Sequence, residues 1–177
     1  RFVAPANGVD VNGIINGTTP TALYGFDVNS DETVKAIGWA VSAEYLLDKG
    51  YVLGGNVAWN ELTNNAELLD RGFNPQFNTP EWRFNVKFAN RKVTDRIGFN
   101  IQYRWQDAFL WESAIGSGVI PSFGTLDAQV SYKIPDWKTI VKVGGSNITN
   151  ERYITSLSNP RIGSLFYISL SFDEFLN

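Results

Sequence analysis

Side chains that could hold a small molecule gather between Trp105 and Glu112. Trp105, Phe109 and Trp111 are spaced through this stretch, and Glu112 closes it. Aromatic rings can stack on a sugar or a peptide, so these four residues are candidate ligand contacts. Arg161, further along the chain, is a fifth candidate. The competing interpretation assigns Trp105 to an aromatic belt and the others to packing within their own loop.

The composition excludes several kinds of chemistry. The 177 residues include no Cys and no His, which removes thiol and imidazole catalysis and the usual metal ligands built from them. No Gly-rich phosphate loop precedes a helical pattern. A net charge of −3 without a basic block argues against nucleic-acid binding. We therefore expect no enzyme activity, no metal site and no cofactor.

One acidic stretch resembles the start of a calcium-binding loop. Asp27, Asn29 and Asp31 have the alternating spacing of such a loop. The glycine required at the sixth position is missing, and Gly38 stands where a bidentate acid is needed. We therefore interpret the stretch as a solvated acidic loop.

The elements that carry these side chains follow a period of two. In 97–106, five apolar residues from Ile97 to Trp105 alternate with Gly, Asn, Gln and Arg, the pattern of a strand with one apolar and one polar face. About ten residues is the length with which a tilted strand crosses a bilayer. The same pattern predicts seven long strands, at 35–47, 51–60, 81–89, 97–106, 126–134, 138–146 and 164–172, with a further alternating stretch at 22–29.

The predicted connections alternate in length. Short turns fall at 48–50, 91–96 and 135–137, and long loops at 61–79, 107–123 and 147–163. Outer-membrane barrels have short periplasmic turns at one rim and long extracellular loops at the other. The sequence therefore predicts an all-β fold, a segment of seven to eight long antiparallel strands from a transmembrane β-barrel.

Two details favour an apolar face that points outward into lipid. The opposite face carries Gly38, Gly54, Gly98 and Gly144 together with charges, which suits a crowded lumen. Aromatic residues fall at strand ends, as in a membrane-interface belt; they are Tyr45, Tyr51, Trp59, Trp82, Tyr103, Trp105, Tyr132 and Phe172. A soluble ligand-binding β-barrel, with the apolar face inward, is the alternative.

Seven charged residues share the polar faces of the predicted strands. They would line the lumen and form either a structural network or a selectivity ring, of which we favour the network. They are Glu44, Arg83, Lys87, Arg104, Asp127, Lys133 and Lys142.

Four runs resemble the C-terminal end of TonB-dependent outer-membrane receptors, and most of all their SusC-like branch. The runs are FNTPEWRFN (77–85), PSFGTLDAQVSY (121–132), VGGSNITNERY (143–153) and NPRIGSLFYISLSF (159–172). They follow one another in order, and the resemblance as a whole covers nearly all of the chain. The resemblance implies a 22-stranded barrel filled by an N-terminal plug. It places residues 34–177 in the last third of that barrel, and 1–33 in an extracellular loop or strand extension.

The resemblance also implies a function and partners. The chain would be a fragment of an active transporter in the outer membrane of a Gram-negative bacterium, importing a bulky nutrient such as an oligosaccharide or a peptide. Its partners would be the plug, the remaining strands, membrane lipid, the TonB complex and, in some receptors, a SusD-like surface lipoprotein. The charged network would then brace the plug against the wall. A membrane-embedded hydrolase, the enzyme alternative, needs a base that a chain without His lacks.

Overall fold

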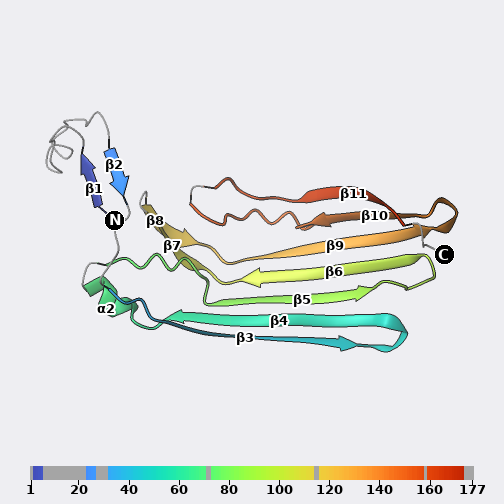
Figure 1. The fold of residues 1–177 in the computed structure, drawn as a ribbon, viewed down its shortest axis with the longest axis horizontal. Coiled ribbons are helices and arrows are strands. Elements are labelled where there is room, and N and C mark those ends of the chain that lie inside the picture. The colour runs from blue at the N-terminus through green and yellow to red at the C-terminus, as the bar shows by residue number, and fades with distance from the viewer. Residues whose placement is uncertain are drawn as a thin grey trace.

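The computed structural model describes residues 2–5, 23–26, 32–70, 73–113, 116–157 and 159–173. Seven long strands form its main sheet: β3 (Ala36–Leu46), β4 (Tyr51–Leu62), β5 (Trp82–Asn90), β6 (Ile97–Gln106), β9 (Phe123–Ile134), β10 (Thr139–Ser146) and β11 (Leu165–Phe172). The order across the sheet is β11-β10-β9-β6-β5-β4-β3, and every neighbouring pair is antiparallel (Figure 1). The seven predicted long strands are all present, which confirms the period-two interpretation.

Short and long connections alternate along this sheet, as predicted. The turns η2 (Asp48–Gly50), 91–96 and η3 (Pro135–Trp137) lie at one end, and the long connections 63–81, 107–122 and 147–164 lie at the other (Figure 1). The hairpin at η2 needs left-handed backbone, with φ of 59° at Lys49 and 78° at Gly50. Glycine adopts that conformation without steric cost, which makes the tight turn possible.

The long connections contain structure that the sequence did not predict. The second contains a hairpin of β7 (Phe109–Ser113) and β8 (Gly116–Ile120), and the first contains helix α2 (Asn65–Asp70). In addition, β1 (Phe2–Pro5), predicted as loop, pairs with β2 (Leu23–Phe26). The prediction of plain loops at these places is wrong, because short elements stabilised by tertiary contacts leave little periodic signal.

The apolar residues of the seven strands form one continuous face. Val57 of β4 lies opposite Val41 of β3 and Phe84 of β5, and the same matching continues to β11, where Ile168 lies opposite Val143. A one-residue slip would move every side chain to the other face, so this match fixes the register.

Aromatic rings flank an aliphatic middle on this face. Near the long loops, Trp39 and Trp82 have ring centroids 5.6 Å apart, and Phe84 stacks on Trp105 at 5.4 Å. Near the short turns, the rings of Tyr51, Phe88 and Phe99 form a second cluster, with centroids 5.4 to 6.3 Å apart. The eight predicted belt residues all share the apolar face, and two aromatic belts around an apolar band are typical of a membrane-spanning barrel.

Very little of this chain is buried against itself. Among the described residues, the buried apolar ones are Ala58, Leu68, Ala89 and Ile120. In contrast, Val130 is 53% exposed and Ile168 is 75% exposed. An apolar face of this extent is unstable in water, so it must meet lipid or another apolar surface. No described helix has the length and hydropathy needed to cross a membrane.

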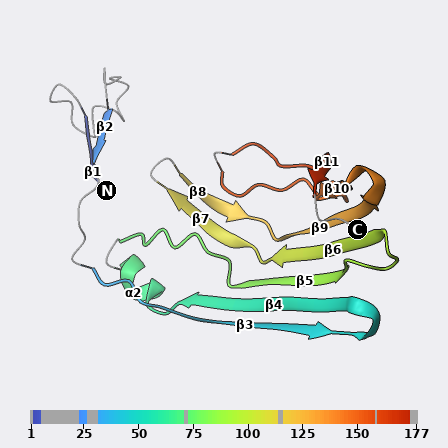
Figure 2. The same cartoon turned by 45° about the vertical axis from the view of Figure 1, so that its right-hand side comes forward.

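The other face of the sheet is polar and hollowed. A cavity of about 900 Å³ is lined by residues of β3, β4, β5, β6, β9 and β10 together with neighbouring turns. The direction of the strands also changes across the sheet. In Figure 2, β3 and β4 lie across the view, whereas β10 and β11 are foreshortened. A single cavity spanning six strands shows that the polar face is the concave one, as in a barrel wall.

Candidate functional site

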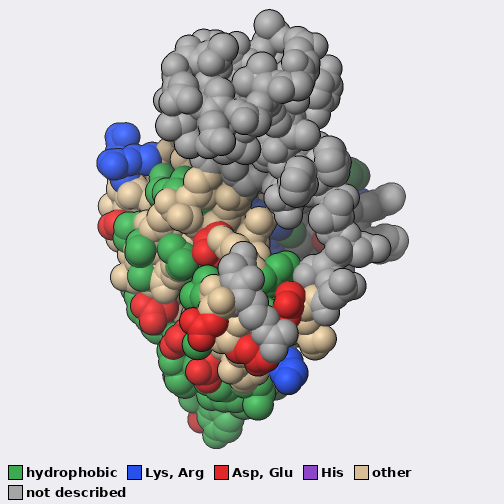
Figure 3. All heavy atoms as spheres, turned by 90° about the vertical axis from the view of Figure 1, so that its left-hand side faces the viewer, with side chains coloured by type: hydrophobic (Ala, Val, Ile, Leu, Met, Phe, Trp, Pro, Cys, Tyr) green, Lys and Arg blue, Asp and Glu red, His purple; other side chains and the backbone are tan. Residues whose placement is uncertain are grey.

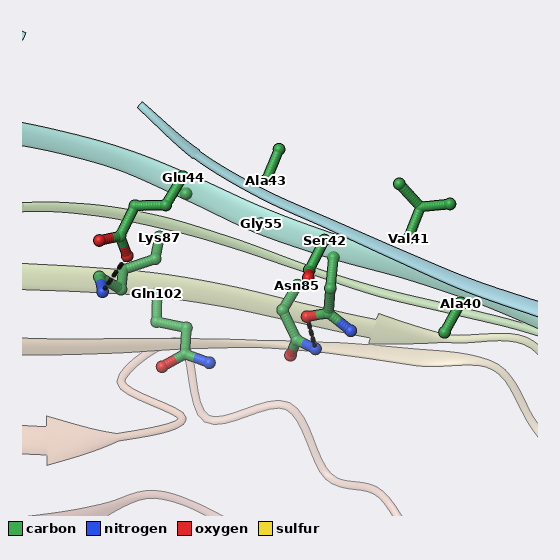
Figure 4. Close-up of a pocket in the computed structure, with 11 residues that line it drawn as sticks. Ala40, Val41, Ser42, Ala43, Glu44, Gly55, Asn85, Lys87 and Gln102 are labelled. Atoms are coloured by element: carbon green, nitrogen blue, oxygen red, sulfur yellow. Dashed lines mark hydrogen bonds and ion pairs between the residues drawn. The ribbon is translucent and has the colours of Figure 1, made fainter. Parts of the chain in front are cut away.

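Glu44 and Lys87 form an ion pair on the concave face that crosses an intervening strand. Glu44 of β3 and Lys87 of β5 both lie opposite Gly54 of β4, and Lys87 Nζ is 3.1 Å from Glu44 Oε2 (Figure 4). A Cβ at Gly54 would lie 3.4 Å from Glu44 Oε2, an ordinary van der Waals contact, so the ion pair passes directly over this position of β4. Val41 of β3 points away from Glu44 and Lys87 (Figure 4).

Tyr167 also makes a contact that crosses an intervening strand. Its hydroxyl on β11 donates a hydrogen bond of 3.0 Å to Gln129 Oε1 on β9, passing over Gly144 of β10. A Cβ at Gly144 would lie 2.7 Å from Tyr167 Oη and 2.9 Å from the Ala128 carbonyl oxygen. Any side chain at Gly144 would therefore displace this bond.

Asp127 of β9 joins the concave face to the last long loop. Its Oδ2 accepts a hydrogen bond of 2.7 Å from Arg104 Nη2 on β6, and its Oδ1 accepts one of 2.8 Å from the backbone N–H of Asn147. Both carboxylate oxygens are used, so Asp127 fixes where the loop leaves β10.

Replacing Asp127 with Asn should loosen this loop. The neutral amide loses the ion pair with Arg104 and keeps one acceptor oxygen. Because Arg104 is 47% exposed, we expect only about 1 kcal/mol of destabilisation. Limited proteolysis should cut 147–164 faster in Asp127→Asn than in the parent. Glu44→Gln, which breaks an ion pair without a loop contact, is the matched control, and equal cleavage of both variants would contradict the assignment.

The long loops are tied to one another at the rim. Asn78, in the first long connection, donates its side-chain N–H to the Glu112 carbonyl oxygen at 2.8 Å and accepts the Glu112 backbone N–H at 2.7 Å. On the other side of the hairpin, Tyr153 of the last loop stacks on Phe123 at 4.1 Å. These contacts make the β7–β8 hairpin part of a continuous rim.

A cavity of about 610 Å³ opens in this rim between β4, α2, the first long loop and β7. Among the described residues, its charged lining consists of carboxylates alone. Figure 3 looks onto the loop end of the sheet, where acidic side chains gather. The carboxylates and the two rings beside them are Glu61, Glu81, Asp107, Glu112, Phe77 and Phe109. The rim cavity is therefore acidic with aromatic contacts.

One polar group of the rim cavity lacks a partner. Asn60 lines the cavity, and its buried Nδ2 has no hydrogen-bond acceptor among the described residues. Buried donors are costly when unpaired, so this amide marks a local cost in stability at the edge of the cavity. No group of three described acids forms a metal site.

The structure separates the five predicted ligand contacts. Phe109 and Glu112 line the rim cavity, whereas Trp111 does not. Trp105 stacks on Phe84 within the aromatic belt of the apolar face, so it lies on the opposite side from the polar site, and the belt interpretation describes its position better. Arg161 is exposed in the last loop.

The structure places all seven predicted lumen residues on the concave polar face. Two ion pairs form among them, Lys87 with Glu44 and Arg104 with Asp127. The acidic stretch from Asp27 to Asp31 lies outside the described residues. Sequence reasoning missed Asn60, Asn78 and Asn147. Asn78 and Asn147 have positive φ, 49° and 51°, a conformation in which Asn is enriched, so the presence of Asn in a loop was the local sequence signal for both.

Two solved receptors share this fold. A mutant of the ferric enterobactin receptor PfeA from Pseudomonas aeruginosa matches with a TM-score of 0.56 and 13% identity, over 75% of this chain and 21% of that chain. The siderophore receptor PiuA from Acinetobacter baumannii matches with a TM-score of 0.60 and 12% identity, over 78% and 22%. The chain thus spans about a fifth of each receptor. No family model and no curated protein matches the sequence.

These likenesses agree with the geometry of the sheet. Seven antiparallel strands in sequential order, with an apolar belt-flanked face and a concave polar face, correspond to one contiguous part of a barrel wall. The chain has the all-β fold of an antiparallel transmembrane β-barrel segment.

Proposed function

We propose that this chain forms part of the wall and rim of a TonB-dependent active transporter in the outer membrane of a Gram-negative bacterium. The observation that carries the proposal is the seven-stranded sheet itself, apolar outside and polar inside, with the fold of two receptors. An open sheet in lipid leaves backbone groups unpaired at its edges. Further strands therefore complete the barrel beside β3 and β11.

The proposed partners are those of such a transporter. A plug fills the concave side, the TonB complex supplies energy, lipid covers the apolar face, and a SusD-like lipoprotein covers the rim. In this arrangement residues 34–177 are barrel wall, and 1–33 belong to an extracellular extension. These statements, like the SusC-like branch, rest on the sequence resemblance together with the shared fold.

The rim cavity bears on the cargo. The four carboxylates that line the cavity favour a neutral or cationic molecule over an anion. The rings of Phe77 and Phe109, which line the cavity, can stack on a sugar or a peptide. We therefore favour an oligosaccharide or a peptide as cargo. A siderophore is the second candidate, favoured by the names of the two receptors.

A small soluble ligand-binding β-barrel, the alternative function, fits the structure poorly. Such a barrel buries its apolar side chains around an interior pocket. Here the 900 Å³ cavity lies on the polar face, and the apolar face is exposed. The arrangement is therefore inverted relative to a soluble barrel.

Uptake by cells that carry the whole native protein tests this function. Uptake of oligosaccharide or peptide should stop when TonB is deleted. Phe109→Ala should lower affinity roughly three- to tenfold, from the loss of one stacking contact. Trp111→Ala, which removes a ring outside the cavity, should leave it unchanged. Uptake that persists without TonB would contradict the transporter, and uptake of an iron chelate alone would favour the siderophore.

A further inference from the structure

Near the short turns, the described part of the concave face carries more positive than negative charge. The 900 Å³ cavity there is lined by Lys87, Arg91, Lys133 and Lys142, and its one acidic residue is Glu44. Glu44 already pairs with Lys87 at 3.1 Å. Arg91, Lys133 and Lys142 therefore have no carboxylate in this cavity, which we call the basic cavity.

The two lysines are close enough to repel each other. Lys133 of β9 lies opposite Ile140 of β10, and Lys142 follows Ile140 by two residues on the same face. Diagonal neighbours of this kind are about 7–8 Å apart at their Cα atoms, within reach of long side chains. The positions next to Lys142 across the sheet are Ser131 and Ser169, so neither neighbour neutralises it.

The charge has the opposite sign at the other end of the strands. There the rim cavity is lined by four carboxylates and, among the described residues, by no Lys or Arg. The concave face at that end also carries Arg83 and Arg104, and Arg104 pairs with Asp127 at 2.7 Å. The difference in sign is therefore between the acidic rim cavity and the basic cavity, and it favours one orientation of a charged segment that reaches both.

We propose that the basic cavity docks a carboxylate-bearing polypeptide segment, with Lys133 and Lys142 as its anchors. The three cations attract a segment that carries several negative charges. A cavity spread over six strands is larger than a simple anion needs. Its uncharged lining, which includes Asn100, Gln129 and Ser131, offers donors and acceptors for backbone groups. This inference rests on the proposed function. It specifies the charge of the segment that lies against the concave face near the short turns.

Site-specific photocrosslinking in the whole native protein tests the proposal. p-Benzoylphenylalanine replaces Ser131, which lies on β9 and lines the basic cavity. The captured peptide is sequenced by mass spectrometry. We expect a segment with more Asp and Glu than Lys and Arg. Capture should fall about tenfold in the double variant Lys133→Glu and Lys142→Glu. Lys49→Glu with Lys138→Glu, the same charge change placed in two turns, should leave it unchanged.

Each outcome decides the proposal. Capture of a neutral or basic segment, capture that survives charge reversal, or capture of no polypeptide would overturn it. If the reversed variant fails to fold, judged by its heat-sensitive gel mobility, Lys133→Gln with Lys142→Gln should still lower capture. A second probe at Val86, on the apolar face, tests the membrane wall separately from the docking segment. Val86 capturing no lipid would contradict the membrane wall, whereas the Ser131 result still decides the docking segment.

Discussion

Replacing Ile101 with Arg is expected to destabilise the protein in lipid by about 2–4 kcal/mol, the cost of a charge near the bilayer midplane on the lipid face of a barrel. Ile101 lies in the middle of β6, with Phe88 and Ala128 as its cross-strand neighbours. Arginine there would have no polar partner on the apolar face. We therefore expect the largest single-residue effect in the sheet at this position.

The adjacent residue provides the control for this prediction. Gln102 lies on the polar face between Lys87 and Asp127, so an arginine there meets one charge of each sign. Gln102→Arg should change the free energy of unfolding by less than about 1 kcal/mol. Denaturant unfolding of the protein in lipid vesicles, followed by tryptophan fluorescence, measures both variants. Equal effects, or a larger effect at Gln102, would reverse the assignment of the two faces.

Replacing Asn147 with Ala is expected to destabilise the last long loop by about 2–4 kcal/mol. Asn147 is 2% exposed, and its side chain donates to the Glu151 carbonyl oxygen at 2.7 Å and accepts the Glu151 backbone N–H at 3.0 Å. Losing these bonds leaves the part-buried N–H and C=O groups of Glu151 without their partner, at about 1–3 kcal/mol. The left-handed backbone, with φ of 51°, adds about 1 kcal/mol for alanine.

A second variant at Asn147 separates these two causes. Asn147→Gly also loses the side-chain bonds but adopts positive φ freely, so it should be about 1 kcal/mol more stable than Asn147→Ala. Hydrogen exchange at the backbone N–H of Glu151 reports the loss in both variants. Protection unchanged from the parent would show that the loop does not depend on this side chain.

The sheet was predictable because its environment imposes a regular pattern. Each long strand separates an apolar from a polar surface, so Ile97 to Gln106 alternates without a break. The same alternation placed the charged residues, among them Lys87 and Asp127, on one face. The connections were predictable in length because polar and Gly- or Pro-containing stretches interrupt the alternation.

The rim was not predictable, for a physical reason. The β7–β8 hairpin and the first long loop are held by individual hydrogen bonds, such as those between Asn78 and Glu112. Bonds of this kind join residues far apart in sequence and impose no period. The candidate site was therefore predicted in part: Phe109 and Glu112 line the cavity, whereas Trp105 belongs to the aromatic belt.

A single-cysteine scan of β6 tests the membrane placement most directly. The chain has no native Cys, so each spin label at 97–106 reports one site without background. In lipid vesicles, labels at Ile97, Phe99, Ile101, Tyr103 and Trp105 should be accessible to oxygen dissolved in the bilayer, and the residues between them should not. The opposite phase, with the even-numbered positions accessible to oxygen and Ile101 shielded, would contradict an outward-facing apolar surface and the transporter wall built on it.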